Sequence, residues 1–137
     1  MISLKELSVA FAAGALGAIV ITILLWLEIK YGITSALSIK ISSMSNSELT
    51  VRIYKMIAWG GLWAFLLLIP YAKSRWFIRG IVFSLIPTVV TFLYFAPQSG
   101  LGYFGVNAGY LMPINILVLN IIWGIVAAWW FNLFASK

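Results

Sequence analysis

The chain has 137 residues, of which 64% are hydrophobic and 9% charged, and it contains neither cysteine nor histidine. An ordinary soluble domain is about 45–50% apolar and about 25% charged, and so short a chain cannot bury this much apolar surface in one core. The composition therefore predicts an all-α, polytopic integral membrane protein in a single domain, residues 1–137. The missing residue types exclude disulfides, Cys or His metal sites, His-bound haem and any triad that needs His.

Uncharged runs define the first two predicted spans, because a bilayer core requires about 20 apolar residues per helix. The run between Glu6 and Glu28 predicts a helix over 5–29. It is longer than the apolar core of a signal peptide, about 7–15 residues, so we expect it to be retained. A capping box with Ser45 as N-cap and Glu48 at the third helical position predicts the start of a second helix over 46–72.

The segment from Gly80 to Ser136 has no charged residue and is too long for one span. Pro97 and Pro113 divide it, since proline stops one helix and suits the first turn of the next. The expected helices cover 75–95 and 112–134. The sequence thus predicts a bundle of four transmembrane helices.

The polar, serine-rich segment 33–44 joins the first two predicted helices. Within it Ile33, Leu37, Ile41 and Met44 recur at roughly helical spacing. This spacing is compatible with a short helix lying in the headgroup region and equally with a plain loop.

The net charge is +6, from nine basic and three acidic residues. The basic residues flank the apolar runs, which indicates contact with lipid headgroups rather than nucleic-acid binding. With four spans, one side holds Lys5, Lys73, Arg75, Arg79 and Lys137, and the other holds Lys30, Lys40, Arg52 and Lys55. The compact basic turn before the third helix favours cytoplasmic termini. The small size and compact loops suggest a bacterial inner membrane.

Small residues recur at four-residue spacing in three predicted helices, a pattern that allows close backbone approach in lipid. These candidate packing residues are Ala10, Gly14, Ala18, Gly60, Ala64, Gly124 and Ala128. They indicate packing within the bundle or, as the second interpretation, a seam between copies of the chain. Matches of Gly14 with Gly80, and of Trp59-Gly60 with Trp123-Gly124, suggest a duplicated helix pair.

The third helix places Ser84, Thr88 and Thr91 on one face, around Pro87. One interpretation is structural, because hydroxyls often satisfy carbonyls that a proline frees. The other is a polar path or pocket between helices. Its candidate residues are Ser84, Thr88, Thr91, Asn120, Trp63 and Trp123, the two tryptophans because they fall near mid-span and need a hydrogen-bond acceptor when buried.

Two further features are candidates for chemistry. Residues 100–105 read GLGYFG, a literal G-x-G-x-x-G, but no strand precedes them and no acid follows, so we expect no nucleotide. The glycine-rich loop 97–112 is expected to cap the bundle, and a re-entrant loop is the alternative. Glu28 is the acid nearest to a span, and we expect a solvated carboxylate at the interface.

These features predict a protein without enzymatic activity, cofactor or metal. The first hypothesis is a structural or accessory protein that acts through helix–helix contacts in the bilayer, as a homo-oligomer or with a partner membrane protein. The alternative is a channel or carrier for a small neutral or weakly polar solute, which would use the hydroxyl, asparagine and tryptophan path.

Overall fold

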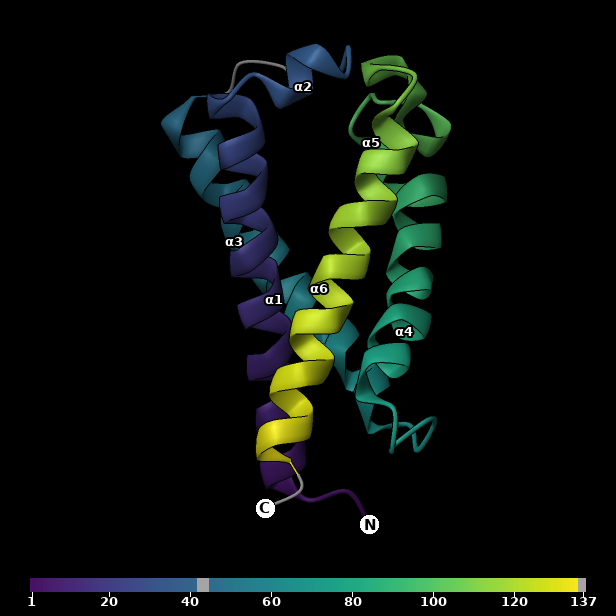
Figure 1. The fold of residues 1–137 in the computed structure, drawn as a ribbon. Helices are drawn as coiled ribbons and strands as arrows, with labels where there is room; N and C mark the ends of the chain where they lie inside the picture. Colours follow the sequence, from purple (N-terminus) through teal and green to yellow (C-terminus); the bar gives the residue numbers. More distant parts are fainter. Residues whose placement is uncertain (42–44, 136–137) are drawn as a thin grey trace.

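The computed structural model describes residues 1–41 and 45–135, and these residues form helices and loops without a strand (Figure 1). Four helical segments are long and apolar enough to cross a membrane, as the sequence predicts: Leu4–Lys30, Asn46–Leu68, Trp76–Gln98 and Met112–Phe134. The elements are α1 (Leu4–Lys30), α2 (Ile33–Ala36), α3 (Asn46–Trp63), the 3-10 helix η1 (Ala64–Leu68), α4 (Trp76–Val90), the π-helical turn η2 (Thr91–Phe95), α5 (Ala96–Gln98), the 3-10 helix η3 (Tyr103–Ala108) and α6 (Met112–Phe134).

Capping boxes begin the first two long helices. The backbone N–H of Glu48 donates to Ser45 Oγ (3.3 Å), and that of Ser45 donates to Glu48 Oε2 (2.9 Å), as predicted. Ser3 and Glu6 form the same pair at α1 (3.1 and 2.9 Å). The same Ser-x-x-Glu spacing is present in the sequence there, so a local pattern also marks the start of α1 at Leu4.

Two helix ends differ from the predicted boundaries because of prolines. The second long helix ends at Leu68 rather than at 72, since Pro70 disfavours helical backbone at Ile69, which is extended. The third continues to Gln98 rather than stopping at 95. Pro97 lies in the first turn of α5, where its missing N–H is tolerated.

The segment after α1 forms only the single turn α2, and positions 42–44 of the predicted interfacial segment lie outside the described residues, as does Lys137. Thr34 and Ile39 are buried. The backbone N–H of Lys40 donates to the carbonyl of Ala108 in η3 (2.6 Å). Together α2 and η3 cover the end of the bundle opposite to the first turn of α1 and the last turn of α6 (Figure 1).

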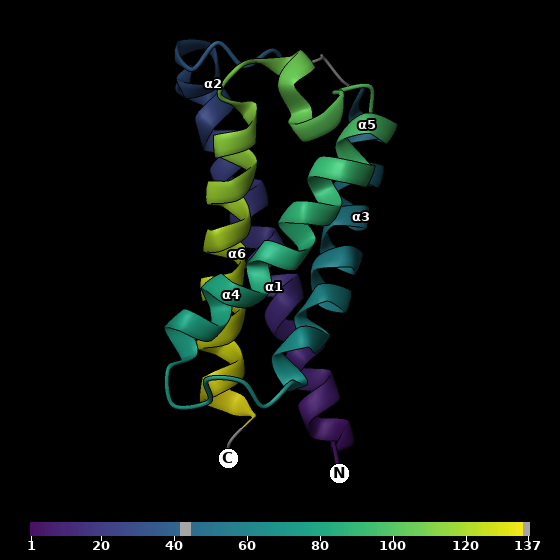
Figure 2. The ribbon, with the colours of Figure 1, turned by 90° about the vertical axis from the view of Figure 1, so that its right-hand side faces the viewer.

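The four long helices form two crossed pairs (Figures 1 and 2). Helix α1 packs against α3, α6 packs against α4, and α1 and α6 also pack against each other. Helices α3 and α4 approach near the turn that joins them and diverge toward the end covered by α2.

The crossing of α1 and α3 depends on the absence of a side chain at Gly14. A Cβ atom there would lie 2.5 Å from the Cβ of Ala64 and would also overlap the carbonyl of Gly60. In α4, a Cβ atom on Gly80 would lie 2.5 Å from the carbonyl oxygen of Gly124. Such contacts leave room for glycine alone.

The same pattern therefore occurs in both helix pairs. Gly14 meets Gly60 and Ala64, and Gly80 meets Gly124 and Ala128, at positions about 64–66 apart in the sequence. All seven predicted packing residues are buried, in positions between helices of this one chain: Ala10, Gly14, Ala18, Gly60, Ala64, Gly124 and Ala128. The geometry matches the duplicated helix pair suggested by the sequence.

Candidate functional site: a cleft between the two helix pairs

A cleft of about 930 Å³ lies between the α1–α3 pair and the α4–α6 pair, beside the contact of α1 with α6. Its mouth lies at the start of α3 and the end of α5, where Glu48, Arg52, Lys55 and Gln98 line it. Its deep end lies at Gly60, beside the contact of α3 with α1. The cleft therefore follows the divergence of α3 from α4 and ends where the helices cross.

The walls of the cleft combine aromatic rings with a few neutral polar groups. The aromatic residues are Trp59, Trp63, Tyr94, Phe95 and Trp123, and the neutral polar ones are Ser47, Thr91, Gln98, Ser99, Asn115 and Asn120. Predominantly apolar walls with a few polar groups are typical of small-molecule sites, in which the polar groups orient the ligand.

The structure brings four of the six predicted path residues together in this cleft: Trp63, Thr91, Asn120 and Trp123. They come from three elements: α3, the π-helical turn η2 and α6. The remaining two, Ser84 and Thr88, are buried in α4 outside the cleft, with exposures of 0% and 3%. The Cβ of Ser84 faces Gly124, which places it in the seam between α4 and α6.

The three hydroxyls of α4 and η2 all donate to carbonyls of their own helix. Ser84 donates to Ile81 (2.7 Å), Thr88 to Ser84 (2.7 Å) and Thr91 to Pro87 (2.8 Å). The structural interpretation of these residues therefore applies in part, because the hydroxyls donate to backbone carbonyls. None of the three donates to the carbonyl of Phe83, four residues before Pro87, which is the one that a proline leaves without its N–H partner.

A π-helical turn, η2, follows Pro87 and forms part of the cleft wall. Such turns are rare and occur often at functional sites, because they rotate the side chains that follow. Here the turn carries Thr91 and Phe95, both of which line the cleft. The sequence signal was Pro87 alone, which indicates a distorted helix but not a wider turn.

Trp123 closes the deep end of the cleft and is 4% exposed. Its indole N–H donates to the backbone carbonyl of Gly14 (3.0 Å). The sequence indicated that a buried indole here needs an acceptor but did not identify one. The acceptor is a carbonyl of α1, accessible because Gly17 leaves space for the indole ring; a Cβ on Gly17 would lie 2.7 Å from Trp123 Cδ1.

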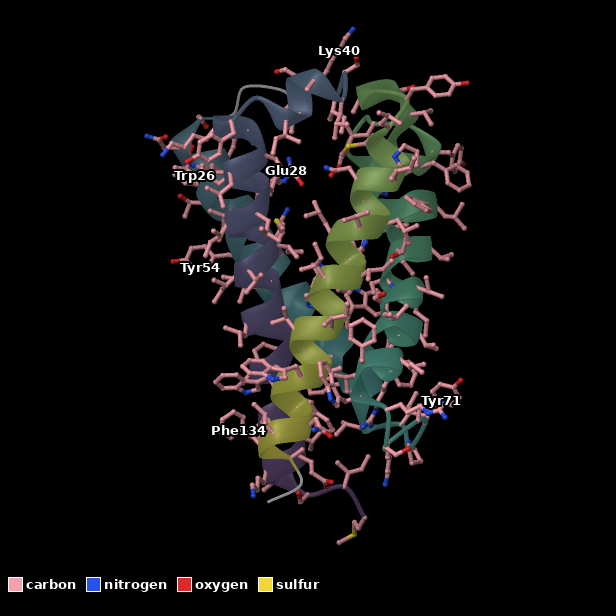
Figure 3. All side chains as sticks on the ribbon, in the orientation of Figure 1. Trp26, Glu28, Lys40, Tyr54, Tyr71 and Phe134 are labelled. Atoms are coloured by element: carbon pink, nitrogen blue, oxygen red, sulfur yellow. The ribbon has the colours of Figure 1, made fainter. Side chains whose placement is uncertain are left out.

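Glu28 and Asn115 join α1 to α6 near the wide end of the cleft. Asn115 Nδ2 donates to Glu28 Oε2 (3.2 Å), and Figure 3 shows the Glu28 side chain directed from α1 toward α6. Glu28 is half-buried, and Asn115 is 8% exposed. No local pattern pairs residues this far apart in the chain.

One aromatic contact spans the gap between α3 and the helical run that begins with α4. The rings of Trp59 and Phe95 lie edge to face with their centroids 5.3 Å apart. Trp59 also stacks on Trp63, one turn deeper (6.2 Å). These rings form a partial side wall where the helix backbones themselves are separated.

The glycine-rich loop lies over the end of the bundle beside α2 (Figure 1). Gly100, Gly102 and Gly105 have positive φ angles, so these glycines are turn residues. Asn107 packs against Gly102, and Met112 against Gly105, where a nucleotide-binding loop would open toward a pyrophosphate.

Rings and neutral polar groups line the deeper part of the cleft. Among the described residues no three His, Cys, Asp or Glu side chains gather as a metal site. The charged residues that line the cleft all belong to its mouth. Its deeper walls can hold an uncharged molecule by ring contacts and by hydrogen bonds to Thr91 and Asn120.

Comparisons of the chain with known protein families, with curated proteins and with solved structures found no match. The geometry of the site must therefore support any functional conclusion directly.

Proposed function

We propose that this chain is an integral membrane protein that binds a small neutral or weakly polar solute in the cleft and carries it across the bilayer. The observation that carries the proposal is the cleft of about 930 Å³, with Trp63, Thr91, Asn120 and Trp123 on its walls. The four span-length apolar helices support the membrane setting.

The large apolar side chains on the outside of the helices support the same setting. Ile19, Ile23, Leu85, Val89 and Val118 are each more than 40% exposed. In water such surface favours aggregation, whereas in lipid it costs nothing. The first turn of α1 and the last turn of α6 lie at one end of the bundle, which agrees with an even number of crossings (Figure 1).

A carrier fits the cleft better than a channel does, because the cleft is open at one end and narrows at the helix crossing. Two equivalent helix pairs related by a repeat also suit alternating access, in which one pair rocks against the other around a site between them. The contact of Gly17 in α1 with Trp123 in α6 would act as the contact point of this motion. The pair of rings Trp59 and Phe95 would part or close as it proceeds.

The proposal is tested by measuring the flux of glycerol, urea and erythritol into liposomes that contain the purified protein, with stopped-flow light scattering. We expect at least one solute to cross faster than in protein-free liposomes. Thr91→Val and Asn120→Leu should each slow this flux by about fivefold, which corresponds to one lost hydrogen bond. An unchanged flux in both variants would contradict the proposal.

Thr88→Val is the matched control for Thr91→Val. Both threonines donate to a carbonyl of their own helix, but Thr88 is buried outside the cleft. We expect the control to retain the flux of the original protein. Equal losses in both variants would indicate a general effect on the helix rather than contact with a solute.

The first hypothesis from the sequence, an oligomeric accessory protein, stays a prediction. Its candidate packing residues are used inside the chain, so an oligomer would need other surfaces. Absence of flux for all three solutes, together with co-purification of a stable partner, would favour the accessory role.

We also propose a bacterial inner membrane with both termini in the cytoplasm, on the basis of the basic turn at Lys73 and Arg75. Because the chain has no cysteine, the single variants Ser47→Cys and Ser74→Cys each introduce one thiol, whose labelling reports on which side of the membrane that position lies. Both positions are exposed. A membrane-impermeant maleimide should label position 47 from outside intact cells, and labelling of position 74 alone would reverse the orientation.

A further inference from the structure

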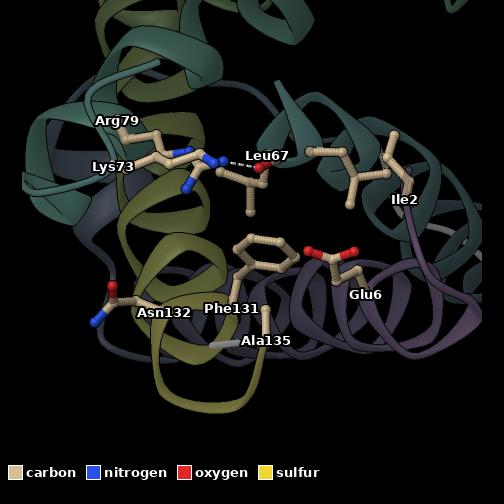
Figure 4. A pocket seen from close by; sticks show the side chains of 9 residues that line it. Ile2, Glu6, Leu67, Lys73, Arg79, Phe131, Asn132 and Ala135 are labelled. Carbon is tan, nitrogen blue, oxygen red and sulfur yellow. Dashed lines mark hydrogen bonds between the residues drawn. The ribbon is translucent and has the colours of Figure 1, made fainter. Parts of the chain in front are cut away.

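A second cavity lies at the other end of the bundle, next to the first turn of α4. It has a volume of about 260 Å³, and Lys73, Arg79, Glu6, Phe131 and Asn132 are among its lining residues (Figure 4). It is separate from the solute cleft, with which it shares no lining residue.

Arg79 is the most buried cation beside this cavity, with an exposure of only 7%. Its Nη2 donates to the carbonyls of Leu67 and Ile69 (2.9 Å to Ile69), which lie at the end of η1, and its guanidinium lies over the ring of Phe131 (5.3 Å). These contacts hold the side chain in place, but they supply no negative charge.

Part of the guanidinium is left without a partner. Arg79 Nε is buried and makes no hydrogen bond, and within the described part of the chain no carboxylate forms an ion pair with Arg79. An arginine keeps its charge in proteins, and a buried charge without a counter-ion is strongly unfavourable. Glu6, the acid that lines the cavity, uses its carboxylate to cap α1 through Ser3.

Packing alone does not require an arginine at this place. In the repeated helix pair, Arg79 occupies the position equivalent to Ala13, and Phe131 the position equivalent to Leu67. Ala13 is fully buried at the corresponding crossing of the first pair. The α1–α3 pair therefore has the small side chain of Ala13 at this position, whereas the α4–α6 pair has the cation Arg79 and a cavity beside it.

We propose that this cavity binds a phosphate group, brought either by an anionic phospholipid or by a soluble phosphate compound. Arg79 and Lys73 would supply charge-assisted donors, for which phosphate oxygens are suitable acceptors. The cavity exceeds the volume of several water molecules, at about 30 Å³ each, and Ile2, Leu68 and Ala135 give it an apolar rim suited to a lipid glycerol backbone.

The experiment measures thermal unfolding of the detergent-purified protein by tryptophan fluorescence while a phosphate compound is titrated. A ligand that binds the folded state raises Tm with its concentration. The probes are phosphatidylglycerol, phosphatidylcholine and inorganic phosphate. A rise with phosphatidylglycerol alone identifies the lipid source, and a rise with inorganic phosphate identifies a soluble one. No rise with any probe overturns the proposal.

Lys73→Gln is the main variant, because Lys73 is exposed in the turn before α4 and its replacement should leave the fold intact. We expect it to raise the half-saturating concentration about tenfold, as for the loss of one hydrogen bond to a charged group. Arg75→Gln is the matched control: it removes an exposed cation from the same turn, but Arg75 does not line the cavity. Equally weakened phosphate binding in both variants would overturn the proposed site, because general attraction to positive charge would then explain the binding.

Glu6→Gln separates the proposed ligand from an internal counter-ion. If the cavity is an anion site, removing the carboxylate should tighten phosphate binding, because one negative charge fewer faces the ligand. If phosphate binding is unchanged in this variant, the Glu6 carboxylate does not face the ligand, and that result would overturn the proposal.

Discussion

Two places between the crossed helix pairs are equivalent in the repeat: the seam between α1 and α6, and the gap between α3 and α4. The seam is closed, and the gap is open. In the closed seam, Trp123 lies against Gly17 and reaches the carbonyl of Gly14. In the open one, the equivalent of Trp123 is Trp59, and the equivalent of Gly17 is Phe83. Trp59 lies edge to face with Phe95.

From this comparison we expect the residue at this one position to influence whether a seam closes in this bundle. Apolar burial does not drive helices together in lipid, so close approach depends on whether a small residue admits the partner. Gly17 admits Trp123 in the closed seam, whereas the bulkier Phe83 stands at the equivalent position of α4. We therefore expect the proposed solute site to depend on this asymmetry between two otherwise similar halves.

Replacing Gly17 by a bulky residue should have the largest effect on stability. Gly17→Phe places in the closed seam the residue found in the open one, and its ring would overlap Trp123. We expect a loss of about 3 kcal/mol or more in unfolding free energy, from overpacking and a lost hydrogen bond. Thermal unfolding in detergent measures it, with Ile19→Phe on the exposed side of α1 as the control. Equal stability of the two variants would show that the seam is not tightly packed.

Removing the bulk at Phe83 is the reverse change. Phe83 is 7% exposed, and its ring lies edge to face with that of Tyr71. Phe83→Ala should lower the unfolding free energy by about 3 kcal/mol if the structure cannot relax. The loss should be smaller if α3 moves toward α4 and fills the space. Spin labels on Leu62→Cys and Val89→Cys, both exposed, report the separation of α3 and α4. We expect a shorter distance in the variant, and an unchanged distance would show that Phe83 does not hold the cleft open.

The two tryptophans should respond differently to loss of the indole N–H. Trp123→Phe removes the donor to Gly14 and should cost about 0.6–1.5 kcal/mol, the range for such bonds in membrane and soluble proteins. Trp59→Phe keeps an aromatic ring against Phe95 and should be nearly neutral. The same unfolding assay compares them, and the reverse order would contradict the proposed difference between the seams.

The smallest effect should come from Glu28→Gln. The bond from Asn115 to Glu28 joins α1 to α6 at the wide end, and glutamine retains an oxygen that can accept it. We expect a change of less than about 0.5 kcal/mol at this half-buried site. Glu28→Leu, which removes the acceptor and leaves Asn115 buried without it, should cost about 1 kcal/mol more. Equal effects of the two substitutions would mean that the bond does not contribute.

The sequence by itself determined the features that depend on neighbouring residues. Hydropathy placed the four span-length helices, and the Ser45–Glu48 pattern placed the start of α3, because a capping box joins residues three apart. The small-residue spacing also indicated where helices can approach closely. Thr91 and Asn120 were singled out because polar side chains are uncommon at such depth.

The tertiary structure alone decided which helix faces meet. A helix that is apolar all round gives no sign of its inner face, because lipid and protein interior are equally suitable for its side chains. The separation of Thr88 from the cleft, the acceptor of Trp123, the burial of Asn115 and the cavity beside Arg79 all depend on contacts between distant parts of the chain. Such contacts follow from the three-dimensional fit of small and large residues, which no local pattern records.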